Sequence, residues 1–285
     1  MIDTHAHLHF PEFAADRPAV ISRAFAFGIT GIIEISVAPQ GWSEVLSLAQ
    51  ADPRIFATLG VHPHEAAAAT PQGLRRLEQR LGAPRVVAVG ETGLDRVRGF
   101  CPWEEQRRAF TAQLGLAREA GLPLVIHCRE AFDELLAVLA AEGASGVRGV
   151  FHCFSGGLAE AEAVIGRGFL VGLGGAVTYA PERWRPLLAA LPREAILLET
   201  DAPFLRPAPD RRGRNEPALL LRTAEALAPE LGMSVAELAS QADANARGLF
   251  GLPPLPAAGG ASEDRPGARD LRPAGGGPPP AGDAC

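Results

Sequence analysis

Eight short apolar runs alternate with longer helical patterns along the chain. Most of the runs are rich in valine, isoleucine and leucine, as is typical of strands buried on both faces of a parallel sheet. They occupy residues 1–8, 31–37, 55–61, 86–89, 123–126, 149–151, 169–173 and 196–198. Helical patterns occupy residues 18–27, 42–50, 71–81, 103–120, 131–142, 159–167, 181–190, 216–227 and 235–250. This order predicts an α/β protein in which a helix follows each strand.

Eight such units in about 250 residues fit a closed (β/α)₈ barrel, a TIM barrel, better than an open doubly wound sheet, which is the alternative. We expect a single barrel domain over residues 1–252. From residue 253 to 285 the composition changes to proline, glycine and alanine with a few charges. Such a segment buries too little apolar surface to fold, and we expect a disordered C-terminal tail.

All seven histidines lie at or just after the C-terminal end of an expected strand, and none lies in an expected helix. They are His5, His7, His9, His62, His64, His127 and His152. Catalytic groups of TIM barrels gather at this end of the strands, whereas histidines with ordinary structural roles also spread over helix surfaces. The placement predicts a functional site at the C-terminal mouth of the barrel.

The opening strand carries a histidine pair, His5 and His7. Side chains of a strand alternate with a period of two, so both imidazoles point to the same side. Neutral imidazole is the commonest protein ligand for metals. An isolated pair would fit two hydrogen-bonded histidines at a polar strand end better than a metal site, but the other histidines favour the metal site.

Two carboxylates complete the expected cluster, Glu91 after the fourth strand and Asp201 after the eighth. Each follows an apolar run, where a buried carboxylate is costly without a partner such as a metal ion. Six candidates exceed the three protein ligands that a single catalytic zinc takes, which favours two ions with a shared ligand. The candidate metal ligands are His5, His7, Glu91, His127, His152 and Asp201.

Seven short motifs carry a resemblance to a known family. In chain order they are residues 3–8 (DTHAHL), 60–63 (GVHP), 90–95 (GETGLD), 126–129 (IHCR), 152–156 (HCFSG), 199–203 (ETDAP) and 214–217 (RNEP). The chain resembles the TatD-related deoxyribonucleases, a branch of the metal-dependent hydrolases, from residue 1 to about 253. It departs from their pattern at residues 209–214 (PDRRGR), where many relatives carry a histidine and a lysine, and in its long tail.

The resemblance implies a TIM-barrel hydrolase that uses divalent metals to cleave phosphodiesters of DNA, in characterised relatives as a 3′ to 5′ exonuclease. It also implies which residues hold each ion: His5, His7 and Asp201 the first, His127 and His152 the second, with Glu91 as the bridge. In barrel hydrolases that open on a His-x-His pair the bridge is often a carboxylated lysine. All 27 cationic side chains of this chain are arginine, so a glutamate must take that place. We expect Zn, Mn or Mg as the ions, with the four imidazoles favouring Zn, Mn or Co over a Mg-only site.

The expected mechanism assigns catalysis to Asp201 and Glu91. Two ions lower the pKa of a shared water, and Asp201 accepts the proton of that water as both ligand and general base. His62 and Arg129 are candidates for contact with a substrate phosphate. Their alternatives are a hydrogen-bonded loop histidine and a loop salt bridge. Asp95 is expected to orient a loop or a ligand rather than to bind metal.

The bulk composition limits the partners and the compartment. A net charge of −6 argues against coating nucleic acid by electrostatics, and 6% aromatic residues offer few platforms for base stacking. We therefore expect DNA, or alternatively RNA, as a weakly and locally bound substrate. No signal peptide or membrane span is evident, and four cysteines lack C-x-x-C spacing, so we expect a cytoplasmic protein with reduced thiols, no membrane and no obligate protein partner.

Two other functions fit the same barrel. An amidohydrolase or lactonase acting on a small molecule would use the same ions to attack a carbonyl carbon. A closed apolar pocket would favour that function, whereas arginines around an open mouth would favour a nuclease. A non-catalytic scaffold is the third interpretation, and the complete set of candidate ligands argues against it.

Overall fold

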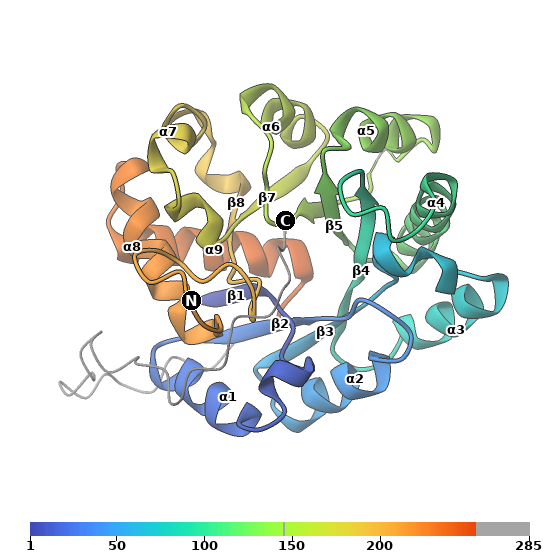
Figure 1. The fold of residues 1–285 in the computed structure, drawn as a ribbon, viewed down its shortest axis with the longest axis horizontal. Helices are drawn as coiled ribbons and strands as arrows, with labels where there is room; N and C mark the ends of the chain where they lie inside the picture. Colours follow the sequence, from blue (N-terminus) through green and yellow to red (C-terminus); the bar gives the residue numbers. More distant parts are fainter. Residues whose placement is uncertain (145, 255–285) are drawn as a thin grey trace.

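Eight parallel strands pair in chain order, β1 to β8, and form the wall of a barrel surrounded by helices (Figure 1). The computed structural model describes residues 1–144 and 146–254, so the tail predicted for residues 253–285 lies almost wholly outside the described residues. The strands are β1 Ile2–Ala6, β2 Gly31–Ile35, β3 Ile55–Leu59, β4 Val86–Asp95, β5 Leu124–Arg129, β6 Gly149–Phe151, β7 Phe169–Leu173 and β8 Ile196–Leu198.

The helices of the described ranges follow the expected alternation. They are α1 Arg17–Ala26, α2 Trp42–Ala51, α3 Pro71–Leu81, α4 Trp103–Ala120, α5 Phe132–Ala141, α6 Leu158–Ile165, α7 Pro181–Ala190, α8 Leu220–Glu230 and α9 Val235–Phe250. Helix α8 begins later than predicted because Pro217–Leu219 forms a separate 3-10 turn. No helix in the described part of the chain combines the length and the apolar character needed to cross a membrane.

The first and last strands meet and close the barrel. The backbone N–H of Asp201 donates to the carbonyl of His5 at 2.8 Å. The buried carboxylate of Asp3 accepts hydrogen bonds from the backbone N–H and the hydroxyl of Thr200, at 3.0 and 2.6 Å. This closure confirms the predicted (β/α)₈ barrel over the open doubly wound sheet, and it places the end of β1 beside the segment that follows β8.

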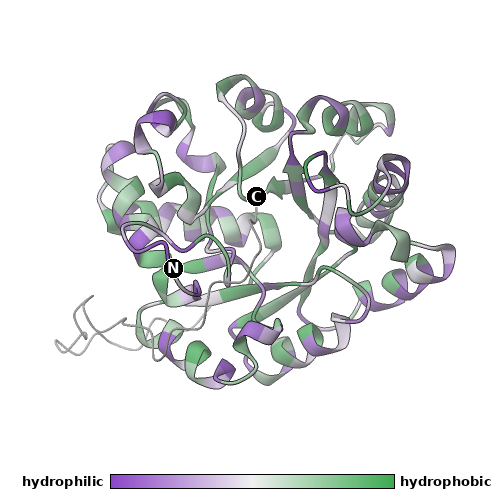
Figure 2. Ribbon diagram, in the orientation of Figure 1, coloured by the Kyte–Doolittle hydropathy of each residue, from purple (hydrophilic) through white to green (hydrophobic). Residues whose placement is uncertain are grey.

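Two apolar layers hold the barrel together. The larger layer lies between the strands and the surrounding helices, and in Figure 2 the strands are mostly coloured as hydrophobic whereas each helix carries both colours. The smaller layer fills the N-terminal end of the barrel, where Phe56, Val125 and Leu197 pack with Leu249 and Phe250 of α9. Helix α9 therefore plugs this end with apolar side chains, and the polar residues inside the barrel are left to the C-terminal mouth.

Strand β4 is longer than predicted, because residues 92–95 continue to pair with β5 as far as Asp95 opposite Arg129. Glu91 therefore lies within the strand rather than after it. A register shift between Val89 and Thr92 interrupts the alternation of side chains. This irregularity explains how Ala88 and Glu91, three positions apart, both face the barrel interior.

Replacing Phe250 by alanine tests whether α9 closes the N-terminal end of the barrel by apolar packing. Phe250 is 5% exposed, and its truncation leaves a cavity at the N-terminal end of the barrel. We expect the free energy of unfolding to fall by about 3 to 5 kcal/mol, measured by urea denaturation followed by circular dichroism. The matched control is Leu158→Ala, which removes a side chain that is 41% exposed and should cost less than about 0.5 kcal/mol. Equal losses in the two variants would contradict the plug.

Candidate metal centre

The candidate ligands come from the C-terminal ends of different strands. His5 lies in β1 with His7 just after it, and His127 lies in β5. His152 directly follows β6, and Asp201 follows β8 by three residues. Because the strands are parallel, these ends meet at one rim of the barrel. The structure groups the ligand atoms within 4.8 Å in three overlapping sets: His5, His7 and Glu91; Glu91, His127 and His152; and His5, His152 and Asp201.

One oxygen of Glu91 faces the histidines of three strands. Its Oε1 lies 2.7 Å from Nε2 of His152, 3.2 Å from Nδ1 of His127 and 3.4 Å from Nε2 of His62. The carboxylate is only 3% exposed. It therefore occupies the centre of this half of the cluster.

The other oxygen of Glu91 faces the histidine pair of β1. Its Oε2 lies 3.5 Å from Nε2 of His5 and 3.9 Å from Nε2 of His7. Asp201 approaches the same pair from β8, with Oδ1 at 3.6 Å from Nε2 of His5 and 3.4 Å from Nε2 of His7. Glu91 thus touches both halves of the cluster, which is the arrangement a bridging ligand needs.

The backbone at Asp201 presents its side chain to the cluster. Its φ is +55°, in the left-handed region that aspartate and asparagine tolerate better than most residues. Its N–H is bonded to the carbonyl of His5. Asp201 is therefore held at the junction of β1 and β8 by its main chain, independently of what its carboxylate binds.

The neighbouring carboxylates and imidazoles of the cluster shift each other's pKa values. Burial would raise the pKa of Glu91, but His152, His62 and His127 outweigh burial and hold that pKa well below its ordinary value. Burial would lower the pKa of His152, yet Glu91 and Glu199 hold it well above its ordinary value. The cluster therefore stabilises positive charge, which either a proton or a metal cation can supply.

Several ring nitrogens in the cluster fit a metal better than a hydrogen-bonded network. Within the described residues, Nδ1 of His5 and both ring nitrogens of His152 are buried and lack a hydrogen-bond partner. Nε2 of His152 approaches Glu91 to 2.7 Å, but without hydrogen-bonding geometry. Buried polar atoms without partners are costly. Imidazole and carboxylate donors are those that Zn and Mn accept, so the residues present fit a divalent cation.

Two further carboxylates support the cluster from behind. Oδ2 of Asp95 lies 3.0 Å from Nε2 of His127 and 2.8 Å from Nε2 of His64, which leaves Nδ1 of His127 to face Glu91. Glu199 lies against Gly172, where a Cβ would come within 2.2 Å of its Oε2, and its Oε1 is 3.7 Å from Nδ1 of His152. A carboxylate hydrogen-bonded to an imidazole, as Asp95 is to His127, fixes the orientation of the ring.

The supporting place of Asp95 agrees with the expectation from sequence. The sequence assigns Glu199 at most a supporting role behind the metal ligands, and its place behind His152 agrees with that expectation.

The remaining histidines and Arg129 lie at different distances from the cluster. His62 is 8% exposed and contacts Glu91, and burial lowers its pKa to about 4. His9 is bound to the buried Glu34 at 2.7 Å, away from the cluster. His64 lies in the 3-10 helix Pro63–Ala68, contrary to the expectation that no histidine is helical. Arg129, half-buried at the end of β5, follows His127 by two residues and so shares its side of the strand.

The chain is similar to known proteins over nearly its whole described length. Residues 2–251 match the model of the TatD related DNase family. A protein named 3′-5′ ssDNA/RNA exonuclease TatD from Erwinia amylovora is 40% identical over 263 residues, which cover 88% of this chain and 100% of that protein. An uncharacterized metal-dependent hydrolase, YabD of Bacillus subtilis, is 34% identical over 88% of this chain and 98% of its own length.

Two solved structures have the same barrel fold as this chain. The crystal structure of YjjV, a TatD homologue from Escherichia coli, superposes with a TM-score of 0.84 at 33% identity, covering 89% of this chain and 98% of that one. The TatD-family hydrolase of Entamoeba histolytica superposes with a TM-score of 0.81 at 22% identity, which speaks to the fold alone.

The thiol of Cys128, next to His127, should be inert in the folded protein. Cys128 is 7% exposed, and burial raises the pKa of its thiol to about 12, so almost no thiolate exists at pH 8. Peptide mapping after treatment with iodoacetamide at pH 8 should find Cys128 unmodified in native protein and alkylated in guanidinium. Equal alkylation in both conditions would contradict this placement.

Proposed function

Because this chain belongs to the TatD-related DNase family, we propose that it is a divalent-metal-dependent hydrolase that removes nucleotides from the 3′ end of single-stranded DNA. The observation that carries the proposal is the buried cluster of four imidazoles and two carboxylates at the barrel mouth. RNA is proposed as a second substrate, since its strand ends offer the same phosphodiester and relatives are named for both nucleic acids.

The proposed cofactor is a pair of divalent ions, Zn, Mn or Mg. When bound, such ions polarise a phosphoryl oxygen and make a water molecule more acidic. The first ion is assigned to His5, His7 and Asp201, the second to His127 and His152, and Glu91 is assigned to both. The contacts of Glu91 with both halves of the cluster support this bridging role.

Asp201 is proposed as the general base. Burial would raise the pKa of Asp201, but His7, His5 and His152 outweigh burial and keep it below its ordinary value, so the carboxylate is ionised at neutral pH. An ionised carboxylate at the rim can accept the proton of the attacking water. Glu91 acts together with Asp201 by fixing the positions of the imidazoles around it.

His62 and Arg129 are proposed to contact the substrate phosphate. His62 is neutral at pH 7 because burial lowers its pKa to about 4, so it can donate one hydrogen bond without adding charge. Arg129 lies at the end of β5, on the side of the strand that carries His127. Its planar guanidinium can bind two phosphate oxygens at once, which a lysine could not do.

The amidohydrolase or lactonase alternative would use the same ions on a carbonyl substrate. No feature of the described residues favours it, and the family match favours the nuclease. A direct comparison of substrates separates the two functions, because the products differ in kind.

The first test is a substrate comparison with metal-stripped protein reloaded with Mg, Mn or Zn. On 5′-labelled single strands the wild type should produce a ladder of progressively shorter products, and it should also cleave bis-p-nitrophenyl phosphate. Lactone and amide substrates should remain intact. Turnover of a lactone without strand shortening would establish the alternative function instead.

The same assay tests Asp201. Asp201→Asn preserves shape and suits the left-handed backbone at this position, so the barrel should stay folded by circular dichroism. Loss of the base should lower kcat roughly 10²- to 10⁴-fold. Turnover like that of the wild type in this variant would refute the assignment.

The number of metal ions bound per chain tests the two-ion site and the bridging role of Glu91. Stripped wild-type protein should bind two equivalents of Zn or Mn by isothermal titration calorimetry. Glu91→Gln should weaken both binding events by at least about tenfold, because the residue contacts both halves of the cluster. Binding should also weaken as the pH falls, and the loss should begin above the ordinary imidazole pKa of about 6.5, because the pKa of His152 is held well above that value and protons compete with the metal there. A single equivalent, or unchanged affinity in Glu91→Gln, would contradict the two-ion site.

A further inference from the structure

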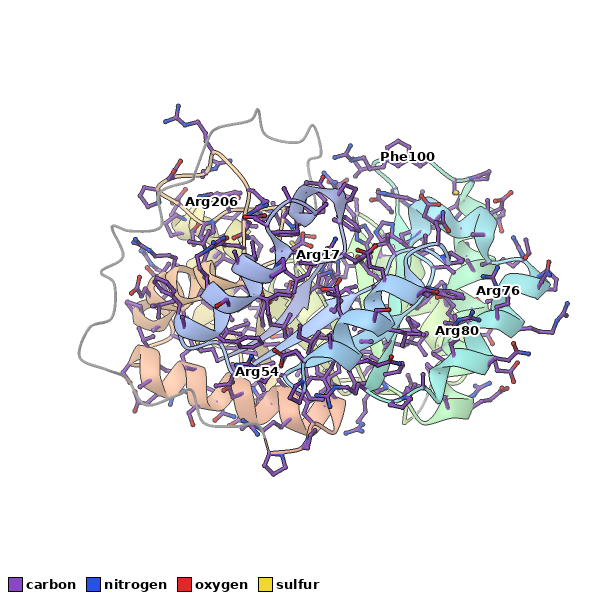
Figure 3. All side chains as sticks on the ribbon, turned by 90° about the horizontal axis from the view of Figure 1, so that it is seen from below. Arg17, Arg54, Arg76, Arg80, Phe100 and Arg206 are labelled. Carbon is purple, nitrogen blue, oxygen red and sulfur yellow. The ribbon has the colours of Figure 1, made fainter. Side chains whose placement is uncertain are left out.

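Exposed apolar side chains gather on the loop between β4 and α4. Among the described residues, three large hydrophobic side chains are prominently exposed: Phe100 at 65%, Val97 at 50% and Leu158 at 41%. Two of them, Val97 and Phe100, lie in the segment of residues 96–102, which leaves the strand that carries Glu91. Figure 3 shows Phe100 projecting at the same end of the barrel as Arg206, opposite the end that α9 covers.

This loop is fixed, so the exposure of Phe100 does not come from a loose chain. Oδ1 of Asp95 accepts hydrogen bonds from the backbone N–H groups of Val97 and Arg98, at 2.7 and 2.9 Å. At the other end, Nε2 of Gln106 donates to the carbonyl of Cys101 at 3.0 Å. The backbone is therefore held on both sides of Phe100, while its side chain is 65% exposed.

Phe100 lies close to the candidate metal centre. Its ring stands edge-to-face with the ring of His64, with centroids 4.9 Å apart. Nε2 of His64 lies 2.8 Å from Oδ2 of Asp95, and the same oxygen is 3.0 Å from Nε2 of His127. Asp95 therefore ties the loop that carries Phe100 to a proposed metal ligand.

The surroundings of Phe100 suit a nucleic acid strand. Arg96 and Arg98 lie on the same loop, and the backbone N–H of Arg96 donates to the carbonyl of Arg129 at 3.1 Å, which joins the loop to the end of β5. The guanidinium of Arg96 pairs with Glu134 and lies over the ring of Trp103, 4.2 Å from the ring centroid. Single-strand binding proteins stack bases on exposed rings that have cationic side chains in their neighbourhood, so an exposed ring on a loop with two arginines suits a strand.

We propose that Phe100 is a stacking subsite for an unpaired base of the strand, next to the phosphodiester held at the metal centre. This inference rests on the proposed function. It deepens that function by giving the enzyme a reason to prefer single strands, because the bases of a duplex are already stacked on one another. Stacking requires no hydrogen-bond pattern, so the subsite accepts every base.

A second copy of the chain is the other occupant that an exposed ring could serve. The apolar patch of Val97 and Phe100 is interrupted by Arg98 and flanked by Arg96. Protein interfaces need a larger continuous apolar surface, with depleted charge at its centre. One exposed ring matches one base better than a subunit.

The experiment combines variants of Phe100 with abasic substrates. On single-stranded DNA, Phe100→Ala and Phe100→Leu should raise KM about tenfold with kcat nearly unchanged, whereas Phe100→Trp should retain wild-type KM. Leu158→Ala is the matched control and should leave both constants unchanged. Leucine keeps the apolar bulk but has no aromatic face, so it separates stacking from simple burial.

The second part of the experiment uses strands in which an abasic nucleotide is placed at each position near the 3′ end in turn. At one abasic position the KM of the wild type should rise by about the factor by which Phe100→Ala raises KM on intact DNA. On the same abasic strand the KM of Phe100→Ala should rise no further. If the KM of Phe100→Ala exceeds that of the wild type by the same factor on intact strands and on abasic strands, whichever position is abasic, the subsite is overturned. A change of oligomeric state in Phe100→Ala by analytical ultracentrifugation would also overturn it, and would assign the ring to a subunit contact. If wild-type protein shortens no strand at all, the proposed function fails instead.

Discussion

The structure depends on a carboxylate held among imidazoles inside a barrel. Glu91 is 3% exposed, and its oxygens lie within 3.5 Å of histidines from β1, from β5 and from the segments that follow β3 and β6. An ionised carboxylate in such a place is tolerated only if positive charge compensates it. That requirement explains the opposed pKa shifts of Glu91 and His152, and it explains why the same group of side chains is suited to divalent cations.

The barrel meets this requirement by dividing its interior into two ends. At the N-terminal end α9 inserts apolar side chains between the strands, and its Asp243 accepts from the backbone N–H of Ile2 while its Asn245 donates to the carbonyl of Ile196. At the C-terminal end Asp95 stands behind His127 and orients its ring toward Glu91, and Glu199 lies behind His152 at 3.7 Å. Stability and chemistry are thus assigned to opposite ends of the same strands, as the architecture of TIM barrels allows.

The mouth of the barrel also offers a way to handle a polymer with few aromatic residues. The aromatic content of 6% suggested weak contact with bases, but composition does not say where rings lie. Phe100 is exposed on a braced loop that Asp95 connects to the cluster. One well-placed ring can contribute more to strand recognition than several buried ones, because only the exposed ring is available for stacking.

The sequence by itself determined the order of strands and helices, the family, and the residue types of the cluster, since periodicity and short motifs are local properties. It also placed the histidines at strand ends, because a strand boundary is readable from apolar runs. Only the tertiary structure decided that Glu91 lies within an extended β4, that Glu199 lies beneath His152 and that Phe100 stands beside His64. Those facts depend on pairing and contact between residues far apart in the chain, and no local pattern encodes the distances that barrel closure imposes.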